Sequence, residues 1–342
     1  AIYLAIRFED GESFVVNIPS NELGRFSSYQ IKTKRYYVFL DDILRLHLDM
    51  LFPQKDILEV HSIKLNKDAD LLIDDEYEGN LVKKIAKQIQ KRNLGTTSRF
   101  LFDISMSDDL LNMLANKLSL ESEDMIKGGR YHNLNDFFQI NINDHQLIYP
   151  QLSSISVPQL NQGRSMLKSM EEQAYLLHFP YQSYVYVLQF FNESSIDPEV
   201  VEINVTFYRM ARNSVIAEAL ISAAKNGKKV AVFMEVKARF DEQNNLEWAI
   251  KMKEAGVKII YSLPGLKVHA KVALVKKKDK MYGFFGTGNL NEKTSEIYCD
   301  HGLLSTDESM TRELSNLFQH LLTKYTPPPF KHLIVSQFGA YE

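Results

Sequence analysis

The stretch that decides the fold and the candidate site lies at residues 264–298 and has the sequence PGLKVHAKVALVKKKDKMYGFFGTGNLNEKTSEIY. The β-branched and apolar residues from Val268 to Val275 predict a β-strand, with a Pro-Gly pair before it and a lysine-rich turn at 276–280 after it. Side chains alternate between the two faces of a strand, so we expect His269 and Lys271 to project from the same face. Two basic groups side by side are typical of an anion site rather than of a core.

The composition fits a globular protein with room for two domains. The 342 residues are 45% hydrophobic and 24% charged, which is ordinary for a chain that buries a core. The net charge of −3 gives no overall field that would attract nucleic acid or a membrane surface, so an anion site must be local. The single cysteine, Cys299, excludes an internal disulfide and a cysteine-based zinc site, and it favours a reducing, cytoplasmic location.

Both ends of the chain resemble cut ends. Ala1 lies within a predicted strand, and the chain stops shortly after the strand-like run 333–335. No apolar run approaches the roughly 18 residues of a membrane span, and no signal peptide is recognised. We therefore expect a fragment of a longer protein.

The first part of the chain predicts a mixed α+β domain. Residues 1–17 predict a hairpin that turns at an Asp-Gly pair, and residues 36–40 predict a further strand. Helices are predicted over residues 43–51, 78–92 and 107–118. The helix at 78–92 is basic and could bind an anion, although a solvated helix face is the simpler interpretation.

Two further segments bear on the organisation of the chain. In the run Gly-Gly-Arg-Tyr-His at 128–132, Arg130 and His132 could contact a phosphate or a neighbouring subunit, and a plain turn fits equally well. Residues 145–165 carry two prolines and many Gln and Ser residues with weak periodicity, so they predict the linker between two domains.

From residue 183 onward, predicted strands and helices alternate. Strands are predicted at 203–208, 230–236, 257–261, 268–275 and 283–286, and helices at 184–192, 213–226, 243–255 and 308–323. This alternation, with short connections that contain glycine, predicts an α/β domain in which helices flank a mostly parallel central sheet.

Two arginines follow neighbouring strands of this predicted sheet. Arg209 comes directly after the strand at 203–208, and Arg239 comes shortly after the strand at 230–236. Ligands of such sheets bind beyond the carboxyl ends of the strands, and guanidinium groups bind phosphate oxygens in pairs without losing their charge. Either arginine alone could form a surface salt bridge, but two at adjacent strand ends favour an anion site.

A Gly-Thr-Gly-Asn turn at 286–289 completes the candidate site. Its glycines let the backbone approach a ligand, and Asn289 could bind an imidazole or a phosphate oxygen. The turn alone is weak support, and His269 alone would be interpreted as a hydrogen-bonded core histidine. Combined with His269-x-Lys271 upstream, the turn is much stronger support for an anion site.

These motifs resemble those of a known superfamily. His269-x-Lys271 followed by Gly-Thr-Gly-Asn resembles the His-x-Lys half-motif of the phospholipase D superfamily, which uses a histidine nucleophile and a phosphohistidine intermediate. Longer runs are similar to one family in it, the bacterial polyphosphate kinases of the first type. These runs are 206–211, 226–230, 238–242, 262–271 and 286–294, with 37–42 and 128–133 in the first domain.

The resemblance implies an organisation and an activity. Residues 1–155 would be a head domain with possible dimer contacts, 156–330 a phospholipase D-like catalytic domain, and 331–342 the start of a second catalytic domain. The activity would be reversible transfer of the terminal phosphate of ATP to a growing inorganic polyphosphate chain, with Mg²⁺ as cofactor. Partners would be ATP or ADP and polyphosphate, not nucleic acid. The full-length protein would be a dimer or tetramer, with membrane association left open.

The resemblance also implies roles for individual residues. His269 would be the phosphorylated histidine, and Lys271 would stabilise charge on the transferring phosphoryl group. Arg209 and Arg239 would lie at the phosphate and Mg²⁺ site, acting through the phosphate because a guanidinium has no lone pair for a metal. Tyr298 would lie against the nucleotide.

The chain departs from the wider pattern in two ways. Lys276 stands where the superfamily half-motif usually has Asp, which agrees with the kinases rather than the phospholipases. The family is also longer, with a helical domain before the head domain and a second catalytic domain that supplies another histidine. Two alternatives stay open: a phosphodiesterase or phospholipase-like hydrolase with its second half-site on a partner, and a non-catalytic fragment that binds polyphosphate or nucleotide. We expect this fragment alone to be weak or inactive.

Overall fold

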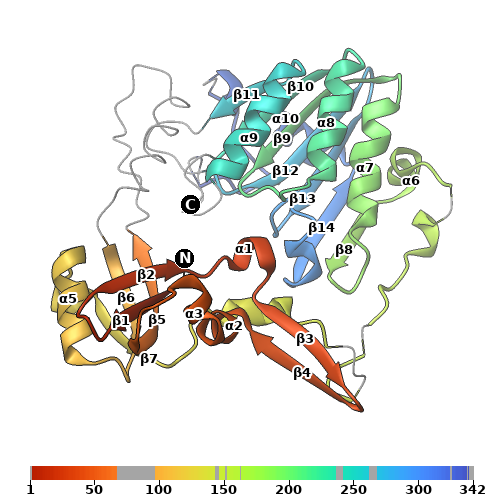
Figure 1. Ribbon diagram of the computed structural model, residues 1–342. Coiled ribbons are helices and arrows are strands. Elements are labelled where there is room, and N and C mark those ends of the chain that lie inside the picture. Colours follow the sequence, from red (N-terminus) through yellow and green to blue (C-terminus); the bar gives the residue numbers. More distant parts are fainter. Residues whose placement is uncertain are drawn as a thin grey trace. The chain divides into compact units, whose positions relative to one another are not determined.

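The fold was obtained as a computed structural model (Figure 1). It describes residues 2–67, 97–142, 146–150, 152–161, 163–235, 242–261, 268–323, 326–336 and 338. The described residues form two compact units, one that extends to residue 150 and one that begins at residue 152. The predicted basic helix at 78–92 and the predicted phosphate ligand Arg239 lie outside the described residues.

The first unit is built on a five-stranded sheet in the order β2-β1-β5-β6-β7. Its strands are β1 (Ile2–Phe8), β2 (Ser13–Asn17), β5 (Ile57–Lys67), β6 (Thr97–Asp103) and β7 (Met125–Gly128). A separate hairpin consists of β3 (Phe26–Ile31) and β4 (Lys34–Phe39). The predicted hairpin at 1–17 and the predicted strand at 36–40 are therefore confirmed, with shifts of one or two residues at their ends.

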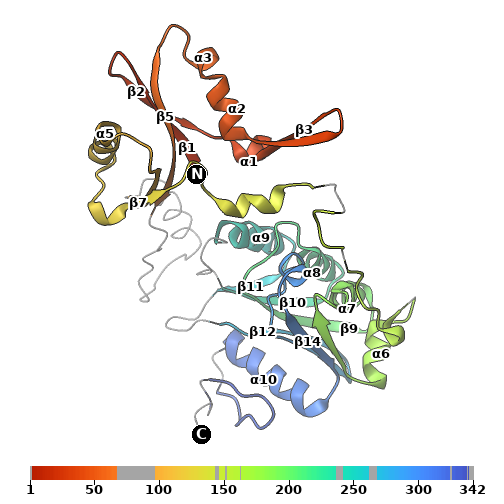
Figure 2. The same ribbon diagram turned by 90° about the horizontal axis from the view of Figure 1, so that it is seen from below.

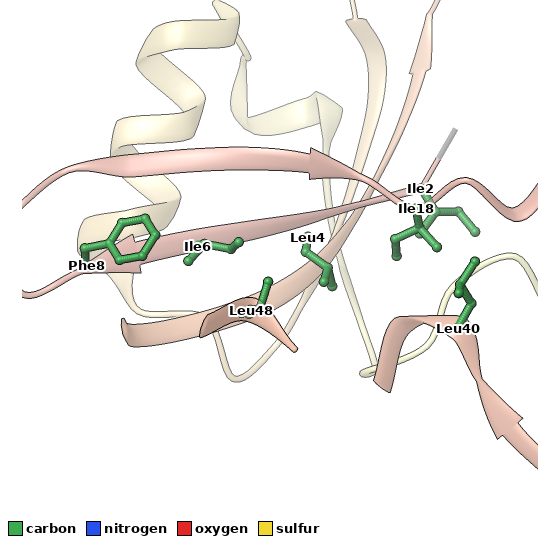
Figure 3. Close-up of a cluster of buried hydrophobic side chains, with 7 residues drawn as sticks. All are labelled: Ile2, Leu4, Ile6, Phe8, Ile18, Leu40 and Leu48. Atoms are coloured by element: carbon green, nitrogen blue, oxygen red, sulfur yellow. The ribbon is translucent and has the colours of Figure 1, made fainter. Parts of the chain in front are cut away.

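Helices pack on this sheet through two separate apolar clusters. The helices that contribute to these clusters are α2 (Leu40–Leu46), α3 (Leu48–Leu51) and α5 (Asp108–Leu118), whereas α1 (Ser20–Leu23) buries no residue. The first cluster, seen in Figure 3, contains Ile2, Leu4, Ile6, Phe8, Ile18, Leu40 and Leu48. Ala5, on the opposite face of β1, belongs to the second cluster with Leu110 and Leu114 of α5. Alternation along β1 thus buries both of its faces, which explains its nearly unbroken apolar sequence.

The second unit is built on a seven-stranded sheet in the order β11-β10-β9-β12-β13-β14-β8. Its strands are β8 (Tyr175–Phe179), β9 (Val200–Phe207), β10 (Lys229–Met234), β11 (Lys258–Tyr261), β12 (Lys271–Lys277), β13 (Met281–Gly286) and β14 (Asp300–Ser305). Its helices are α6 (Met166–Glu172), α7 (Val185–Ile196), α8 (Val215–Lys225), α9 (Glu242–Glu254) and α10 (Glu308–Thr323). The α/β class is confirmed, as are the four predicted helices.

The prediction of a mostly parallel sheet needs a correction. The two adjacent pairs β9–β10 and β10–β11 are parallel, whereas the four pairs from β9–β12 to β14–β8 are antiparallel. The short turn at 278–280 accounts for the β12–β13 pair, since so few residues can join these two strands only as an antiparallel hairpin. The strand predicted at 268–275 also begins three residues later, at Lys271.

Helices cover both faces of this sheet. Figure 2 shows α7, α8 and α9 on one face and α10 on the other. On the α10 side, Phe233 and Leu274 from the sheet pack against Leu314, Phe318 and Leu321 from the helix. Both faces of the sheet are therefore buried, which leaves the ends of its strands as the place where a site can form.

Four strands bring their ends to the same edge of the sheet. Phe207 at the end of β9 pairs in register with Met234 at the end of β10. Lys271 at the start of β12 pairs with Gly286 at the end of β13. Because β12 runs antiparallel to β9, the chain leaves β9 and enters β12 at this edge. The segments that carry Arg209, His269 and Asn289 therefore all adjoin it.

Candidate active site

A cavity of about 330 Å³ is formed at this edge. Its lining includes five of the six predicted site residues: Arg209, His269, Lys271, Asn289 and Tyr298. The sixth, Arg239, lies outside the described residues. The lining also includes Thr287, Gly288, Thr294, Cys299 and Asp300. Residues that are 89 positions apart in the sequence thus meet at one cavity, while their chemical roles stay predictions.

His269 and Lys271 are in direct contact. The Lys271 Nζ atom lies 2.9 Å from Nδ1 and 3.0 Å from Nε2 of His269, and it donates a hydrogen bond of 2.6 Å to the His269 carbonyl oxygen. Lys271 is buried at the start of β12, whereas His269 precedes the strand and is exposed. The ring of Tyr208 packs edge-on against the imidazole with 4.9 Å between the ring centres. The expected pairing of the two basic side chains is therefore present, although only Lys271 belongs to the strand.

Thr206 of β9 holds the segment that carries His269. Its Oγ1 donates a hydrogen bond of 2.7 Å to the carbonyl oxygen of Ala270 and accepts one of 3.1 Å from the amide of Val272. One buried hydroxyl thus uses both its donor and its acceptor capacity on the backbone around Lys271. This fixes the position from which the imidazole projects.

The loop that carries Arg209 is held by buried side chains of α9. Asn245 is fully buried; its Oδ1 accepts from the amide of Met210 at 3.2 Å, and its Nδ2 donates to the carbonyl oxygen of Tyr208 at 2.9 Å. The same Nδ2 donates to the carbonyl oxygen of Glu235 at 3.2 Å. Asn245 therefore ties the residues after β9 to the residue after β10.

Two more side chains complete the support of this loop. Trp248 Nε1 donates a hydrogen bond of 2.9 Å to the carbonyl oxygen of Ala211, and Asn291 Nδ2 donates one of 3.5 Å to that of Arg209. The Arg209 guanidinium carbon lies 5.7 Å from the centre of the Tyr208 ring. The backbone that presents Arg209 is thus braced from α9 and from the segment after the Gly-Thr-Gly-Asn turn.

The Gly-Thr-Gly-Asn turn is braced by the start of β14. Thr287 Oγ1 donates a hydrogen bond of 2.8 Å to Oδ1 of Asp300 and accepts one of 2.9 Å from the amide of His301. A Cβ atom on Gly288 would lie only 2.2 Å from Oδ2 of Asp300, so a side chain at this position would require Asp300 to move. Glycine was expected to admit a ligand; at Gly288 it admits the Asp300 carboxylate. The Oδ1 atom of Asn289 is buried and has no hydrogen-bond partner among the described residues.

Charges around the cavity are mostly positive. Among the described residues that line it, Arg209, Lys271 and His269 are basic and Asp300 is the one carboxylate. Behind it, burial raises the pKa of Tyr184, and the carboxylates of Glu292 and Asp300 add to this shift, so the phenol stays neutral. The arrangement suits a bound anion.

Several supporting residues were not identified from the sequence. Among them, Thr206, Asn245 and Asp300 act through contacts with residues 10 to 66 positions away. A single threonine in a strand, asparagine in a helix or aspartate at the start of a strand carries no local signal of such a role.

The Gly-Gly-Arg-Tyr-His run in the first unit contacts that unit's own residues. Arg130 and the Tyr131 hydroxyl bind the two oxygens of Asp42 at 2.7 and 2.6 Å, and His132 Nε2 lies 2.9 Å from the carbonyl oxygen of Ser62. Burial opposes ionisation of Asp42, but the hydrogen bonds from Tyr131 and Arg130 outweigh it and lower its pKa. Burial lowers the pKa of His132. These contacts favour the interpretation as a structural turn.

Known protein domains match most of the chain. The polyphosphate kinase middle domain matches residues 1–140, and the polyphosphate kinase C-terminal domain 1 matches residues 165–327. No helix in the described ranges is long and apolar enough to cross a membrane.

Curated and solved relatives carry the same description. A polyphosphate kinase of Yersinia pestis is 35% identical over 349 residues, and one of Klebsiella pneumoniae is 36% identical over 349 residues; each match covers 98% of this chain and 51% of the relative. The crystal structure of polyphosphate kinase from Porphyromonas gingivalis superimposes with a TM-score of 0.73 and 33% identity, covering 96% of this chain and 50% of that one. The chain spans about half the length of the relatives it matches.

Proposed function

Because the chain belongs to the polyphosphate kinase family, we propose that it transfers the terminal phosphate of ATP reversibly to inorganic polyphosphate through a phosphohistidine at His269. The observation that carries the proposal is the contact of His269 with Lys271 in a cavity that Arg209 also lines. In this proposal the first unit corresponds to a head domain at 1–155, and the second to a catalytic domain at 156–330.

The first half-reaction needs a neutral imidazole. A ring nitrogen of His269 attacks the terminal phosphorus of ATP, an N–P bond forms, and the bond from that phosphorus to the bridging oxygen breaks. ADP leaves with the bonding electron pair, and the other ring nitrogen keeps its proton. The ammonium of Lys271, 2.9 Å from the ring, disfavours a second positive charge on the imidazole and so keeps a nitrogen lone pair available.

The second half-reaction returns the histidine to its starting state. A terminal oxygen of the polyphosphate chain attacks the phosphorus on His269, the N–P bond breaks, and its electron pair returns to the ring. The chain is then one phosphate longer. Since both donor and acceptor are phosphate chains, one cationic cavity serves both half-reactions in turn, and the reverse sequence makes ATP from ADP.

Positive side chains around His269 would stabilise the transferring group. Phosphoryl transfer depends on positioning and charge stabilisation more than on covalent chemistry. Lys271 and Arg209 line the cavity with His269, and Arg239 would join them from the segment after β10. Tyr298 is exposed at the rim, where its ring could lie against a nucleotide base.

The donor atoms of the cavity fit a divalent cation that is bound mainly by the substrate. In the part of the chain that the structure describes, no group of three or more His, Cys, Asp or Glu could bind a metal ion. Mg²⁺ commonly needs only one or two carboxylates besides substrate phosphates, and one carboxylate lines this cavity. When bound, the ion would neutralise phosphate charge. Arg209 and Arg239 would act on the phosphate oxygens, because a guanidinium has no lone pair.

A substrate comparison tests the proposed function. The purified full-length protein, with this fragment beside it, is supplied with ATP and polyphosphate, with ADP and polyphosphate, and separately with bis(p-nitrophenyl) phosphate; the expectations that follow are those for the full-length protein. We expect nucleotide-dependent transfer in both directions and no diester hydrolysis. Hydrolysis of the diester without nucleotide would contradict the proposal in favour of a phosphodiesterase, and binding of polyphosphate without any turnover would favour a non-catalytic module.

A further inference from the structure

Asp300 is the one acidic side chain in the described lining of a cavity otherwise rich in basic groups. Its Oδ1 accepts the hydrogen bond from Thr287, and within the described ranges its Oδ2 makes no hydrogen bond or ion pair. Oδ2 lies against Gly288, where it would be 2.2 Å from a Cβ atom if there were one. The carboxylate is therefore held in place while one of its oxygens keeps its lone pairs available.

A carboxylate at this place conflicts with a site for phosphate chains. Its negative charge repels phosphate oxygens, and the repulsion is stronger in a partly desolvated cavity than in bulk water. Bracing Thr287 does not require the charge, because the amide oxygen of an asparagine would accept the same hydrogen bond. The conflict disappears if a cation lies between Asp300 and the phosphates.

We propose that Oδ2 of Asp300 is the protein's own ligand to the divalent cation that accompanies the phosphate substrates. This inference rests on the proposed function, since the phosphates supply the remaining ligands. A carboxylate oxygen is the ligand that hard divalent cations prefer, and a single one suffices when phosphates complete the shell. The buried Oδ1 of Asn289, which has no hydrogen-bond partner among the described residues, is a second oxygen in the same lining.

The experiment measures metal and anion binding rather than turnover. Mn²⁺ is the paramagnetic probe and inorganic tripolyphosphate is the anion. Mn²⁺ affinity in the presence of tripolyphosphate is measured by electron paramagnetic resonance, and tripolyphosphate affinity without metal by calorimetry. The proteins are the wild type, Asp300→Asn, and Asp279→Asn as a control with the same charge change. Asp279 is exposed in the turn beyond the other end of β12, on the order of 20 Å away along the strand.

The expected result is a loss of Mn²⁺ affinity without any loss of tripolyphosphate affinity. Asp300→Asn should weaken Mn²⁺ binding about tenfold or more, as expected when a metal site loses a supporting ligand. The same variant should bind metal-free tripolyphosphate as tightly as the wild type or more tightly, because a like charge has been removed. Asp279→Asn should follow the wild type in both measurements.

Three outcomes would overturn the inference. Unchanged Mn²⁺ affinity in Asp300→Asn would show that Asp300 is not a ligand of the cation, although the proposed anion site would still stand. Equal weakening of Mn²⁺ and of metal-free tripolyphosphate would assign Asp300 a purely structural role as the brace of Thr287. Failure of the wild type itself to bind tripolyphosphate would contradict the proposed function, and the inference with it; this failure is distinguished from the others because it occurs without any substitution.

Discussion

The two ends of strand β12 carry cavities of similar size and different chemistry. The cavity at the start of the strand has a volume of about 330 Å³, and the one beyond its end about 390 Å³. At the start, Lys271 lies against His269. At the far end, Lys277 binds Asp197 at 2.8 Å, and Lys280 binds a carboxylate at 3.0 Å. Volume alone therefore does not distinguish a candidate site from a surface hollow.

The difference lies in what each lysine contacts. Lys276, at the position where the superfamily half-motif usually has Asp, pairs with Glu202 at 3.2 Å. Lys280 pairs with Glu171 of α6, whose other oxygen accepts a hydrogen bond from Tyr282. The far end is thus a set of ion pairs between neighbouring elements. At the near end, Lys271 contacts the His269 imidazole instead of a carboxylate. Lysines paired with carboxylates stabilise the fold, whereas a lysine beside an imidazole is suited to binding an anion.

Among the residues around His269, Arg209 should give the largest loss when it is substituted. Arg209→Ala should lower kcat by about 10²–10³-fold, as for loss of one preorganised charge stabiliser, with a smaller change in stability. Steady-state kinetics of ATP-dependent polyphosphate synthesis by the full-length protein measure the change in kcat. Arg212→Ala is the matched control, because Arg212 is exposed on the same loop and does not line the cavity. A loss of kcat below about threefold in Arg209→Ala would show that Arg209 has a structural role, like the lysines in ion pairs at the far end of β12.

An intermediate effect is expected from Asn245, which touches no predicted substrate. Asn245→Ala removes the amide that ties the residues after β9 to the residue after β10, so kcat should fall about tenfold or more through misplacement of Arg209. Unfolding free energy should fall by about 1–3 kcal/mol, because buried backbone groups lose their partners.

The control for Asn245 separates positioning from stability. Ala249 lies on the same helix and is buried, so Ala249→Gly should cost about 1–2 kcal/mol through helix propensity and the loss of a buried methyl group. It should leave kcat within about twofold of the wild type when assayed well below the unfolding temperature. Equal kcat losses in the two variants would show that the effect of Asn245 is general destabilisation.

The smallest effect is expected at the far end of β12. Lys277→Met removes the ion pairs with Asp197 and Glu199 and should lower unfolding free energy by at most about 1 kcal/mol, with kcat unchanged. A kcat loss above threefold would contradict the contrast between the two ends.

The pH dependence of that stability difference follows from Asp197. Burial opposes ionisation of Asp197, but the hydrogen bond from Lys277 and other contacts outweigh it and lower its pKa. A lowered folded-state pKa adds stability that is fully present above the ordinary value of 3.8 and is lost as the pH falls through the lowered value. Denaturant unfolding should therefore show the difference between wild type and Lys277→Met at pH 7 and a smaller one below pH 3.8.

The sequence predicted the members of the candidate site better than the sheet that brings them together. His-x-Lys, the arginine after β9 and the Gly-Thr-Gly-Asn turn are local patterns, and the residues they named line one cavity. Edge strand β8 and strand β14 were missed, because their short runs contain polar residues and pair across more than 100 positions. The antiparallel direction of β12 and β13 could have been predicted from the three residues between them.

Residues that hold others in place could not be predicted in this way. Thr206, Asn245 and Asp300 have roles only through backbone atoms or side chains brought near by folding. The sequence correctly marked Gly288 as a position of close approach. The group that approaches it, however, is the protein's own Asp300 carboxylate and not a ligand. Arg239 lies outside the described residues, and its role stays a prediction.

The most direct test of the account is the identification of the phosphorylated residue. The purified full-length protein is incubated with ATP labelled in its terminal phosphate, and the label is examined for lability in acid, stability in base and position in the peptide map. The account predicts an acid-labile label on the peptide that contains His269, absent in His269→Ala and retained in Arg212→Ala. Acid-labile label that persists in His269→Ala, or that maps to another peptide, would contradict it.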